Sequence, residues 1–190
     1  MTDEHEKADE DAVAQHFMRL ALDQAAMARQ AGEVAVGAVV VLDGRVIGSG
    51  FNQPISANDP TAHAEVIALR DAARAIGNYR LTGSAMYVTV EPCLMCVGAM
   101  IHARVQQVVS GATEPKAGAL VSAARAPETP GLNHRLEAAG GVLAEDCRRL
   151  LQAFFAERRG RGRSGLEEPN HGSSTVLLRG DLSASPPLWP

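Results

Sequence analysis

The sequence predicts an α/β fold in which a mixed β-sheet lies between two layers of helices. Residues 36–42 form a nearly continuous apolar run, which is typical of a strand that is buried on both faces. Asp43-Gly44 follows at once and is a strong signal for a two-residue hairpin, so we expect the next strand to return antiparallel. Beyond the hairpin, helical and extended patterns alternate, and this order places helices on both faces of the sheet.

A helix over residues 12–31 is expected before the first strand. Asp11 suits its N-cap and Gly32 its end. Its apolar stripe recurs at helical spacing and consists of Val13, Phe17, Leu20, Ala21 and Met27.

The later elements follow from the same kinds of signal. They are expected in this order: a strand from Arg45 toward Asn52, a helix over about 62–76 opened by Asn58-Asp59-Pro60, a strand over 85–90, a helix over 93–103, a strand over 105–110, a loop over 112–133 with one short helical turn, a short strand over 140–143, and an amphipathic helix over 145–158.

The chain of 190 residues fits one domain with tails, since domains commonly have roughly 100–200 residues. We expect an acidic N-terminal extension over 1–11, a folded domain over 12–159 and a flexible tail over 160–190. The tail is rich in Gly, Ser, Pro and Arg and carries too little apolar surface to offset the entropy of ordering. No apolar run approaches the roughly 18 residues of a membrane span, so no membrane association is expected.

The net charge of −4 conceals an uneven distribution. The extension holds six acids and one base, which leaves 16 acids and 17 bases in the rest of the chain. The charge therefore neither supports nor excludes a nucleic-acid partner. The sequence has three cysteines, an odd number that makes a poor disulfide framework, and the start of the chain lacks the features of a secretory signal. Both observations favour a reducing, cytoplasmic location.

Two short segments supply ligands of the kind that zinc prefers. His63-Ala64-Glu65 is followed by Pro92-Cys93-Leu94-Met95-Cys96, which gives one imidazole, two thiols and a carboxylate beside the histidine. A closed structural zinc site takes four protein ligands, whereas a catalytic site takes three and leaves a position for water. Cys93 and Cys96 are three apart at a predicted helix start, so both can reach one ion.

Other interpretations of these segments stay open on spacing alone. A Cys-x-x-Cys pair also serves redox chemistry, and Cys147, His102 or His134 could complete a closed four-ligand site. On an ideal helix, positions 63 and 65 would point apart. They can flank one site only if His63 precedes the regular helix.

The combined pattern indicates hydrolytic chemistry. Two thiolates and a neutral imidazole cancel the charge of Zn²⁺, which can still lower the pKa of bound water from 15.7 to about 7. A carboxylate that lies beside this water without binding the metal can take its proton and pass it on. The spacing H-x-E followed by P-C-x-x-C is the signature of zinc deaminases, which add water to a ring carbon and release ammonia.

Longer segments carry a closer resemblance. Residues 61–65, 91–96, 98–102 and 133–135 resemble the bacterial tRNA-specific adenosine deaminases (the TadA family) within the cytidine/deoxycytidylate deaminase superfamily. The likeness extends from about residue 14 to 159 and includes 36–39, 51–52 and 78–81. It implies a cytidine deaminase-like α/β/α sandwich with five central strands, a homodimer, one Zn²⁺ per subunit, and conversion of adenosine to inosine at the wobble position of a tRNA anticodon.

The resemblance also implies roles for particular residues. It makes Glu65 the proton shuttle and Asn52 a hydrogen-bonding partner of the flipped adenine. It makes His102 and His134 structural hydrogen-bond donors. The remaining implied site residues are the zinc ligands His63, Cys93 and Cys96, the base-pocket residues Val36, Ala64 and Val90, and Glu114 and Lys116 in a loop that meets the neighbouring nucleotides of the anticodon stem-loop.

The chain departs from the family pattern at two positions. Ala35 stands where proline is usual and Glu114 where aspartate is typical, which leaves the pocket rim and the stringency toward substrate open. One alternative function is deamination of a free nucleobase or nucleoside of the guanine, adenosine or cytosine type. Another is a non-catalytic partner subunit that keeps zinc for folding, but Glu65 would have no use in such a site.

Overall fold

Five strands form one mixed sheet in the computed structural model, which describes the backbone of residues 2–164 and the side chains of residue 5 and residues 8–159. The strands are β1 (Gly37–Leu42), β2 (Arg45–Phe51), β3 (Ala85–Val90), β4 (Gln107–Ala112) and β5 (Glu137–Gly140). Their spatial order is β2-β1-β3-β4-β5. β1 runs antiparallel to both β2 and β3, whereas β3, β4 and β5 run parallel. The predicted mixed five-stranded sheet is confirmed.

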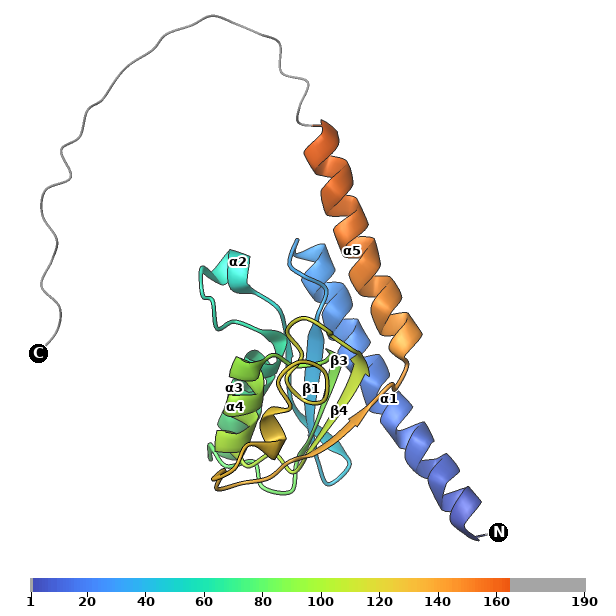
Figure 1. Ribbon diagram of the computed structural model, residues 1–190, viewed down its shortest axis with the longest axis vertical. Coiled ribbons are helices and arrows are strands. Elements are labelled where there is room, and N and C mark those ends of the chain that lie inside the picture. The colour runs from blue at the N-terminus through green and yellow to red at the C-terminus, as the bar shows by residue number, and fades with distance from the viewer. Residues whose placement is uncertain (1, 165–190) are drawn as a thin grey trace, which may run out of the picture.

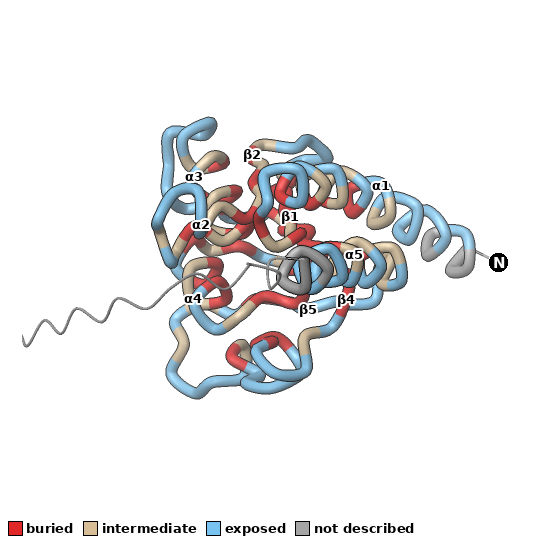
Figure 2. The backbone as a smooth tube through the Cα atoms, turned by 90° about the horizontal axis from the view of Figure 1, so that it is seen from above, coloured by how far each residue is buried: buried red, intermediate tan, exposed pale blue. Residues whose placement is uncertain are grey.

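Helices cover both faces of this sheet. They are α1 (Thr2–Gln30), α2 (Pro54–Ala57), α3 (Ala64–Ile76), α4 (Leu94–Ala103), the 3₁₀ turn η1 (Ala126–Glu128) and α5 (Ala144–Ser164). α3 and α4 lie on one side of the sheet, and α1 and α5 lie on the other (Figures 1 and 2). Each side has its own apolar core, the first built around Val40, Val88 and Met100 and the second around Phe17, Met18 and Tyr87. The three-layer sandwich is confirmed.

The hairpin between β1 and β2 forms as its sequence predicts. Asp43 and Gly44 both have positive φ, 50° and 71°, and the strands meet at the pair Leu42 and Arg45. Two successive residues with positive φ give a turn whose twist matches that of the strands.

Helix α3 packs unusually close to β2 because two strand positions lack side chains. A Cβ at Gly50 would lie 2.5 Å from the carbonyl oxygen of Ala64, and one at Gly48 would lie 2.4 Å from the nitrogen of Ala72. The backbone atoms that face these two glycines belong to Ala64, Ala68 and Ala72, which are fully buried. The first turn of α3, where the sequence predicts the site, is therefore held directly against the sheet.

Several element boundaries differ from the prediction. α1 begins at Thr2 and not after Asp11, since residues 2–11 contain no proline or glycine and their acids favour a helix N-terminus. α5 continues to Ser164, so residues 160–164 belong to it, whereas 165–190 lie outside the described residues. The division into extension, domain and tail stays a prediction. Among the described residues, no helix is both long and apolar enough to cross a membrane.

The last strand is displaced by three residues from the predicted 140–143. β5 pairs with β4 from Gln107 opposite Glu137, and positive φ at Gly141 ends it. All four of its residues are exposed, so no buried apolar pattern marks it in the sequence. β4 likewise begins and ends two residues later than predicted.

Candidate metal centre

The segments that carry the predicted ligands lie together at one end of the strands, which we call the site edge of the sheet. β2 and β3 end there and β1 begins there, because β1 is antiparallel to both of its neighbours. α3 and α4 each start just beyond this edge, with His63 and Cys93 as their N-cap residues. Ligand sites in open α/β sheets usually lie at such an edge, where helix N-termini supply partial positive charge.

The extended backbone at the two N-caps decides how the ligands face each other. His63 has φ −75° and ψ 151°, and Cys93 has φ −76° and ψ 171°. His63 thus precedes the regular helix, so its side chain is not bound to point away from that of Glu65, as it would on an ideal helix. This resolves the point that spacing alone left open.

Three ligand atoms form a nearly equilateral triangle. The sulfur of Cys93 lies 3.6 Å from that of Cys96, and His63 Nδ1 lies 3.7 Å from the Cys93 sulfur and 3.6 Å from the Cys96 sulfur. Tetrahedral zinc, with Zn–S near 2.3 Å and Zn–N near 2.0 Å, places its ligand atoms roughly 3.5–3.8 Å apart. The donor set and its dimensions therefore fit one zinc ion.

The protonation of this triangle is coupled. Hydrogen bonds with Cys96 and His63 lower the pKa of the Cys93 thiol to about 3. The hydrogen bond with Cys93, together with burial, raises the pKa of Cys96. A hydrogen bond with Cys93 also raises the pKa of His63. Cysteine binds zinc as a thiolate and histidine as a neutral imidazole, so a metal ion competes here with these shared protons.

Glu65 lies in the first turn of α3, beside the ligands but outside the triangle. Its side chain is buried, with 4% exposed, and burial raises the pKa of its carboxyl group. The carboxyl group interacts with all three ligand residues, His63, Cys93 and Cys96. A buried acid of raised pKa next to a metal-ligand set is suited to accept and return a proton.

Asn52 ties the end of β2 to the start of α3. Its Oδ1 accepts a hydrogen bond of 2.8 Å from the backbone N–H of Ala64, and its own N–H donates to the carbonyl of Val36 at 3.1 Å. Its Nδ2 makes no hydrogen bond to any described residue, so this group is available as a donor. Three predicted site residues are thereby brought together.

Val90 lies on the same edge. Ala38 pairs with Val88, and continuing this register by two residues sets Val36 opposite Val90. Val90 is buried, with 8% exposed, and Val36 is half-buried. The two valines therefore present an apolar surface at the edge of the sheet that carries the ligands.

Comparison with known proteins shows the family of this chain. Residues 11–112 match the family described as the cytidine and deoxycytidylate deaminase zinc-binding region. The chain belongs to the cytidine and deoxycytidylate deaminase family. A tRNA-specific adenosine deaminase of Haemophilus influenzae is 50% identical over 144 residues, which cover 75% of this chain and 83% of the relative.

Two solved structures resemble this chain in fold. A structure from work on A-to-I editing by tRNA:A34 deaminases at the wobble position of transfer RNA is 42% identical and has a TM-score of 0.69. The match covers 71% of this chain and 98% of that one. A guanine deaminase from Nitrosomonas europaea has a TM-score of 0.62 at 21% identity, with 75% of this chain and 84% of that one covered. The latter likeness shows the fold alone.

The residues considered for a fourth zinc ligand lie elsewhere in this deaminase. Cys147 is buried in the core between the sheet and α1, on the opposite face from the ligands. His134 Nε2 lies 2.7 Å from the carbonyl oxygen of Val105, which confirms a structural hydrogen bond. His102 is exposed on α4 and has no hydrogen-bond partner among the described residues, so a structural hydrogen bond from it stays a prediction. The three-ligand set is the candidate metal group in the part of the chain described.

Two loop residues have local contacts that the sequence did not indicate. Glu114 Oε1 accepts a hydrogen bond from the backbone N–H of Lys116, while the Lys116 side chain is exposed. Contact between these residues and nucleotides stays a prediction. Ala35 is buried, with 1% exposed, and its effect on the pocket rim also stays a prediction.

Two buried carboxylates near the site were missed by reasoning from the sequence. Glu33 accepts hydrogen bonds from the backbone N–H groups of Ile55 and Ser56, and so fixes α2 beside Asn52. Glu91 accepts several hydrogen bonds from the loop that follows β4. A signal did exist for Glu91, because an acid directly after a continuous apolar strand lies at the edge where ligand sites form.

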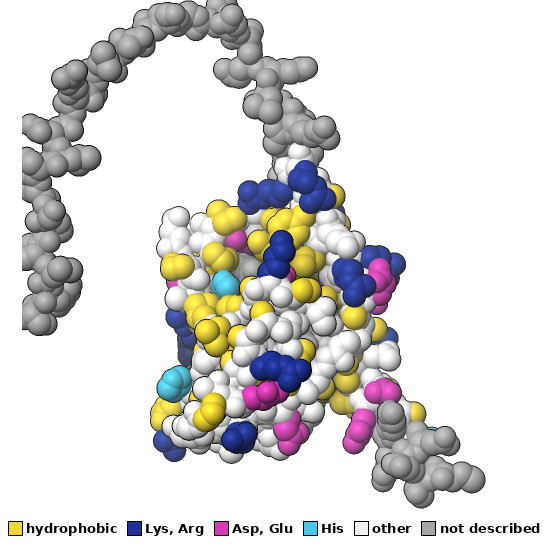
Figure 3. Space-filling view, viewed as in Figure 1, with side chains coloured by type: hydrophobic (Ala, Val, Ile, Leu, Met, Phe, Trp, Pro, Cys, Tyr) yellow, Lys and Arg dark blue, Asp and Glu magenta, His cyan; other side chains and the backbone are white. Residues whose placement is uncertain are grey.

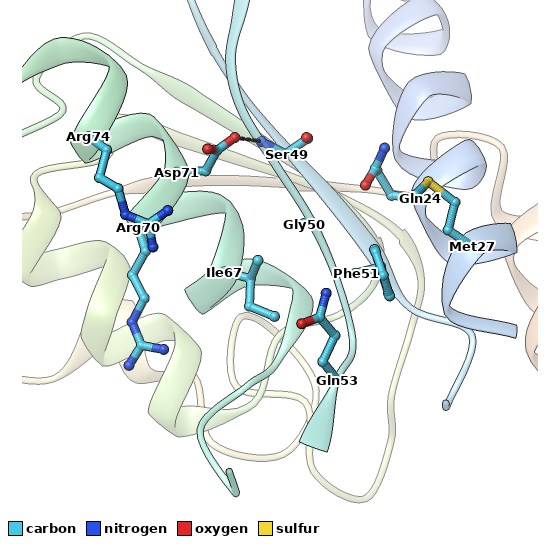
Figure 4. Close-up of a pocket in the computed structure, with 10 residues that line it drawn as sticks. All are labelled: Gln24, Met27, Ser49, Gly50, Phe51, Gln53, Ile67, Arg70, Asp71 and Arg74. Atoms are coloured by element: carbon cyan, nitrogen blue, oxygen red, sulfur yellow. Dashed lines mark hydrogen bonds between the residues drawn. The ribbon is translucent and has the colours of Figure 1, made fainter. Parts of the chain in front are cut away.

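A separate hollow of about 530 Å³ lies between α1, β2 and α3 (Figure 4). Arg70 and Arg74 line it from α3, and Asp71 accepts a hydrogen bond of 3.0 Å from the backbone N–H of Ser49. That bond satisfies one free donor of the edge strand β2. None of the predicted site residues lines this hollow.

Proposed function

We propose that this protein deaminates adenosine to inosine at the wobble position of a tRNA anticodon. The observation that carries the proposal is the triangle of His63, Cys93 and Cys96 with the buried acid Glu65 beside it. The substrate is supported by the relatives, since the chain spans 83% of a tRNA-specific adenosine deaminase at 50% identity. Similarity to a tRNA:A34 deaminase structure supports the same nucleotide.

The reaction balances as adenosine plus water giving inosine plus ammonia. Zinc held by His63, Cys93 and Cys96 would supply the Lewis acidity that makes water a nucleophile near neutral pH. Glu65 takes the proton of the attacking water and delivers it to N1 of the adenine ring. A C–O bond forms at C6. Glu65 then takes the proton of the new C6 hydroxyl group and passes it to the amine, which leaves as ammonia when the C6–N6 bond breaks. Burial keeps this carboxyl group ready to hold the proton between the two steps.

Asn52 and the valines orient the base in this proposal. The Oδ1 of Asn52 already accepts a hydrogen bond from the backbone N–H of Ala64, so the side chain offers Nδ2 as a donor to an acceptor atom of adenine. Val36, Ala64 and Val90 provide the apolar wall that a flat ring requires. An anticodon loop is already partly unstacked, so moving one base into such a pocket costs less than in a duplex.

Basic groups near the site suit the phosphates of the stem-loop. Arg158 donates a hydrogen bond of 3.2 Å to the carbonyl of Gly32, which places the basic end of α5 beside the loop that leads to Val36. Lys116 is exposed in the loop that follows β4. In Figure 3, Lys and Arg side chains gather near this end of α5, whereas acids mark the region where α1 begins.

The decisive experiment is sequencing of tRNA for inosine after incubation with the purified protein. Rates on an anticodon stem-loop, on free adenosine, and on guanine and cytosine are measured in parallel. We expect inosine at the wobble position and no turnover of the free compounds. Turnover of a free base or nucleoside without turnover of the stem-loop would reverse the assignment.

We also propose a homodimer formed through α3 and α4. The outer face of these helices has an apolar hollow of about 300 Å³, lined in part by Val66, Leu69 and Ala99. Tyr79 at its rim is 64% exposed. Gly98 lies on α4, where a Cβ would meet nothing within 4 Å, so the fold of one chain gives no reason for a glycine there. A close approach by a second helix would give one.

The dimer is tested by adding a long side chain where one chain has room for it. Gly98→Glu should leave the fold intact and convert a dimer to a monomer in sedimentation. Val13→Glu is the matched control, because Val13 is 52% exposed on α1, on the opposite side of the sheet. A wild-type monomer, or a Gly98→Glu dimer of unchanged affinity, would show that this face is not the interface.

A cytoplasmic location is part of the same proposal. The three cysteines are free, and two of them belong to the ligand set. Thiolate ligands are preserved in a reducing compartment, which is also where tRNA is found.

A further inference from the structure

Glu91 is a buried carboxylate to which the proposed chemistry gives no role. It directly follows β3, only 4% of it is exposed, and its backbone N–H donates to the carbonyl of Ala112 at 2.8 Å. No Lys or Arg among the described residues forms an ion pair with it. A buried charge without a counterion is costly unless hydrogen-bond donors surround it.

Five donors surround this carboxylate, and all come from one segment, residues 114–122. Oε1 accepts the backbone N–H groups of Leu120, Val121 and Ser122 at 3.2, 2.9 and 2.9 Å. Oε2 accepts the N–H of Glu114 at 3.1 Å and the hydroxyl of Ser122. Hydrogen bonds to an ionised acceptor are stronger than those between neutral groups. One side chain therefore fixes both ends of the segment.

The same segment lies against Pro92 and Cys93, the second of which is a predicted metal ligand. Gly118 pairs with Cys93 in an isolated antiparallel bridge, and the N–H of Ala119 donates to the carbonyl of Pro92 at 2.8 Å. A Cβ at Gly118 would lie 2.5 Å from the carboxyl carbon of Glu91 and 2.5 Å from the carbonyl oxygen of Glu114. The segment thus closes around the carboxylate with no room for a side chain at its centre.

We propose that Glu91 is a positioning residue that fixes segment 114–122 beside the metal ligands. Through this segment Glu91 sets how tightly the RNA binds and leaves the chemical step unchanged. The segment carries Glu114 and Lys116, whose contact with RNA is part of the proposed function, whereas the proton-transfer group Glu65 belongs to α3. The effect on RNA rests on the proposed function, but the positioning itself does not.

Glu91→Gln tests the proposal with little change in shape. The glutamine amide keeps one acceptor oxygen. Its NH₂ group faces the donors that bind the second carboxylate oxygen in the wild-type protein. Loss of one or two charge-assisted hydrogen bonds predicts that amide hydrogen exchange within 114–122 rises by about tenfold or more. Exchange in β3 and β4 should stay unchanged, and the chain should keep one zinc. KM for an anticodon stem-loop should rise by about tenfold while kcat changes by less than about threefold.

Glu128→Gln is the matched control, because Glu128 lies in the same loop region and its side chain is 67% exposed. It should alter neither exchange nor KM. Ser122→Ala removes a single donor and should give a smaller rise in both quantities. A purely structural role for Glu91 would instead raise exchange throughout the domain and lower kcat in step with the folded fraction, which would overturn the proposal.

Gly118→Ala is a second test of the proposal, for the case in which Glu91→Gln does not fold. This variant retains the Glu91 carboxylate, but the added methyl group pushes the carboxylate and the segment apart. Amide hydrogen exchange within 114–122 should therefore rise again. Unchanged exchange in this segment, in either variant, would contradict the proposal. If the wild-type protein does not act on the stem-loop, the proposed function fails, and the exchange measurement still decides whether Glu91 positions the segment.

Discussion

Glu65 is distinguished from the other acids of the site by what surrounds it. It is buried beside three metal ligands, interacts with all three, and belongs to the helix whose N-cap is one of them. In the proposed reaction Glu65 makes the proton transfers, and His63, Cys93 and Cys96 bind the metal.

Glu65→Gln should therefore separate catalysis from metal binding. Removing a positioned general acid–base group typically costs 10²–10⁴ in rate, so we expect inosine formation to fall by at least about 100-fold. Zinc content, measured by plasma mass spectrometry, should stay at one ion per chain. Loss of metal together with unfolding would mean that Glu65 is a structural residue.

Asn52 combines two roles that different substitutions can separate. Asn52→Ala removes the acceptor for the Ala64 N–H at the start of α3, and loss of a helix cap costs about 1 kcal/mol. Asn52→Asp retains that acceptor but loses the NH₂ donor. We expect urea denaturation to show a stability loss for the alanine variant, and stem-loop kinetics to show a raised KM for both. A normal KM in Asn52→Asp would exclude Asn52 as a donor to the base.

Helix α3 positions His63, and its distance from β2 depends on Gly50. Gly50→Ala introduces a Cβ 2.5 Å from the carbonyl of Ala64, one residue from the metal ligand. Overpacking of this kind costs typically 1–3 kcal/mol, which urea denaturation can measure. Ser49→Ala is the control, since Ser49 contacts Asp71 through its backbone N–H. Equal stability of the two variants would show that α3 can move away from the strand without penalty.

Metal binding joins the N-termini of α3 and α4, which supply the ligands from two separate segments. Zinc that binds only the folded chain raises the free energy of unfolding by RT ln(1 + [Zn]/Kd), which is about 4 kcal/mol at a zinc concentration 1,000 times Kd. A strong chelator should therefore lower the melting temperature, and added Zn²⁺ should restore it. Glu65→Gln, which keeps all three ligands, should show the same drop and recovery. An unchanged melting temperature would show that the ion contributes nothing to the link between the two helices.

The charge of the whole molecule changes sign along its length. Without residues 1–11 the chain has 16 acids and 17 bases, so its net charge rises from −4 to +1. These acids lie at the start of α1, which extends about 30 Å from Asp11 to its end at Gln30, at 1.5 Å per residue. The chain that follows that end leads to Val36 at the site. The Debye length is about 8 Å in 0.15 M salt and about 30 Å in 0.01 M salt, so only low salt leaves the acids within reach of the RNA.

Deleting residues 1–11 should then leave KM for the stem-loop unchanged at 0.15 M salt and lower it at 0.01 M salt. Stability should change little, because the described side chains among these residues are exposed. The test is a KM measurement across a salt series on both proteins. A large change at 0.15 M salt would show that the extension contacts the RNA or the site directly.

Long and strongly patterned elements could be predicted from the sequence, and β3 matches its predicted range. β5 could not, because its four residues are exposed and form a strand only through pairing with β4. The three metal ligands could be named because their residue types and spacing are unusual. Glu33 and Glu91 could not be assigned roles in the same way, since their partners are backbone N–H groups from segments 22 to 31 residues away.

By itself, the sequence determined the ligand set, the acid beside it and the deaminase family, because these depend on residue type and local spacing. Only the tertiary structure decided that His63 and Cys93, 30 residues apart, meet as N-caps of two helices at one sheet edge. It also decided that the Asn52 side-chain oxygen accepts a hydrogen bond from Ala64, and that Glu91 holds the loop beside the metal ligands. These contacts follow from strand order and register, which no local pattern encodes.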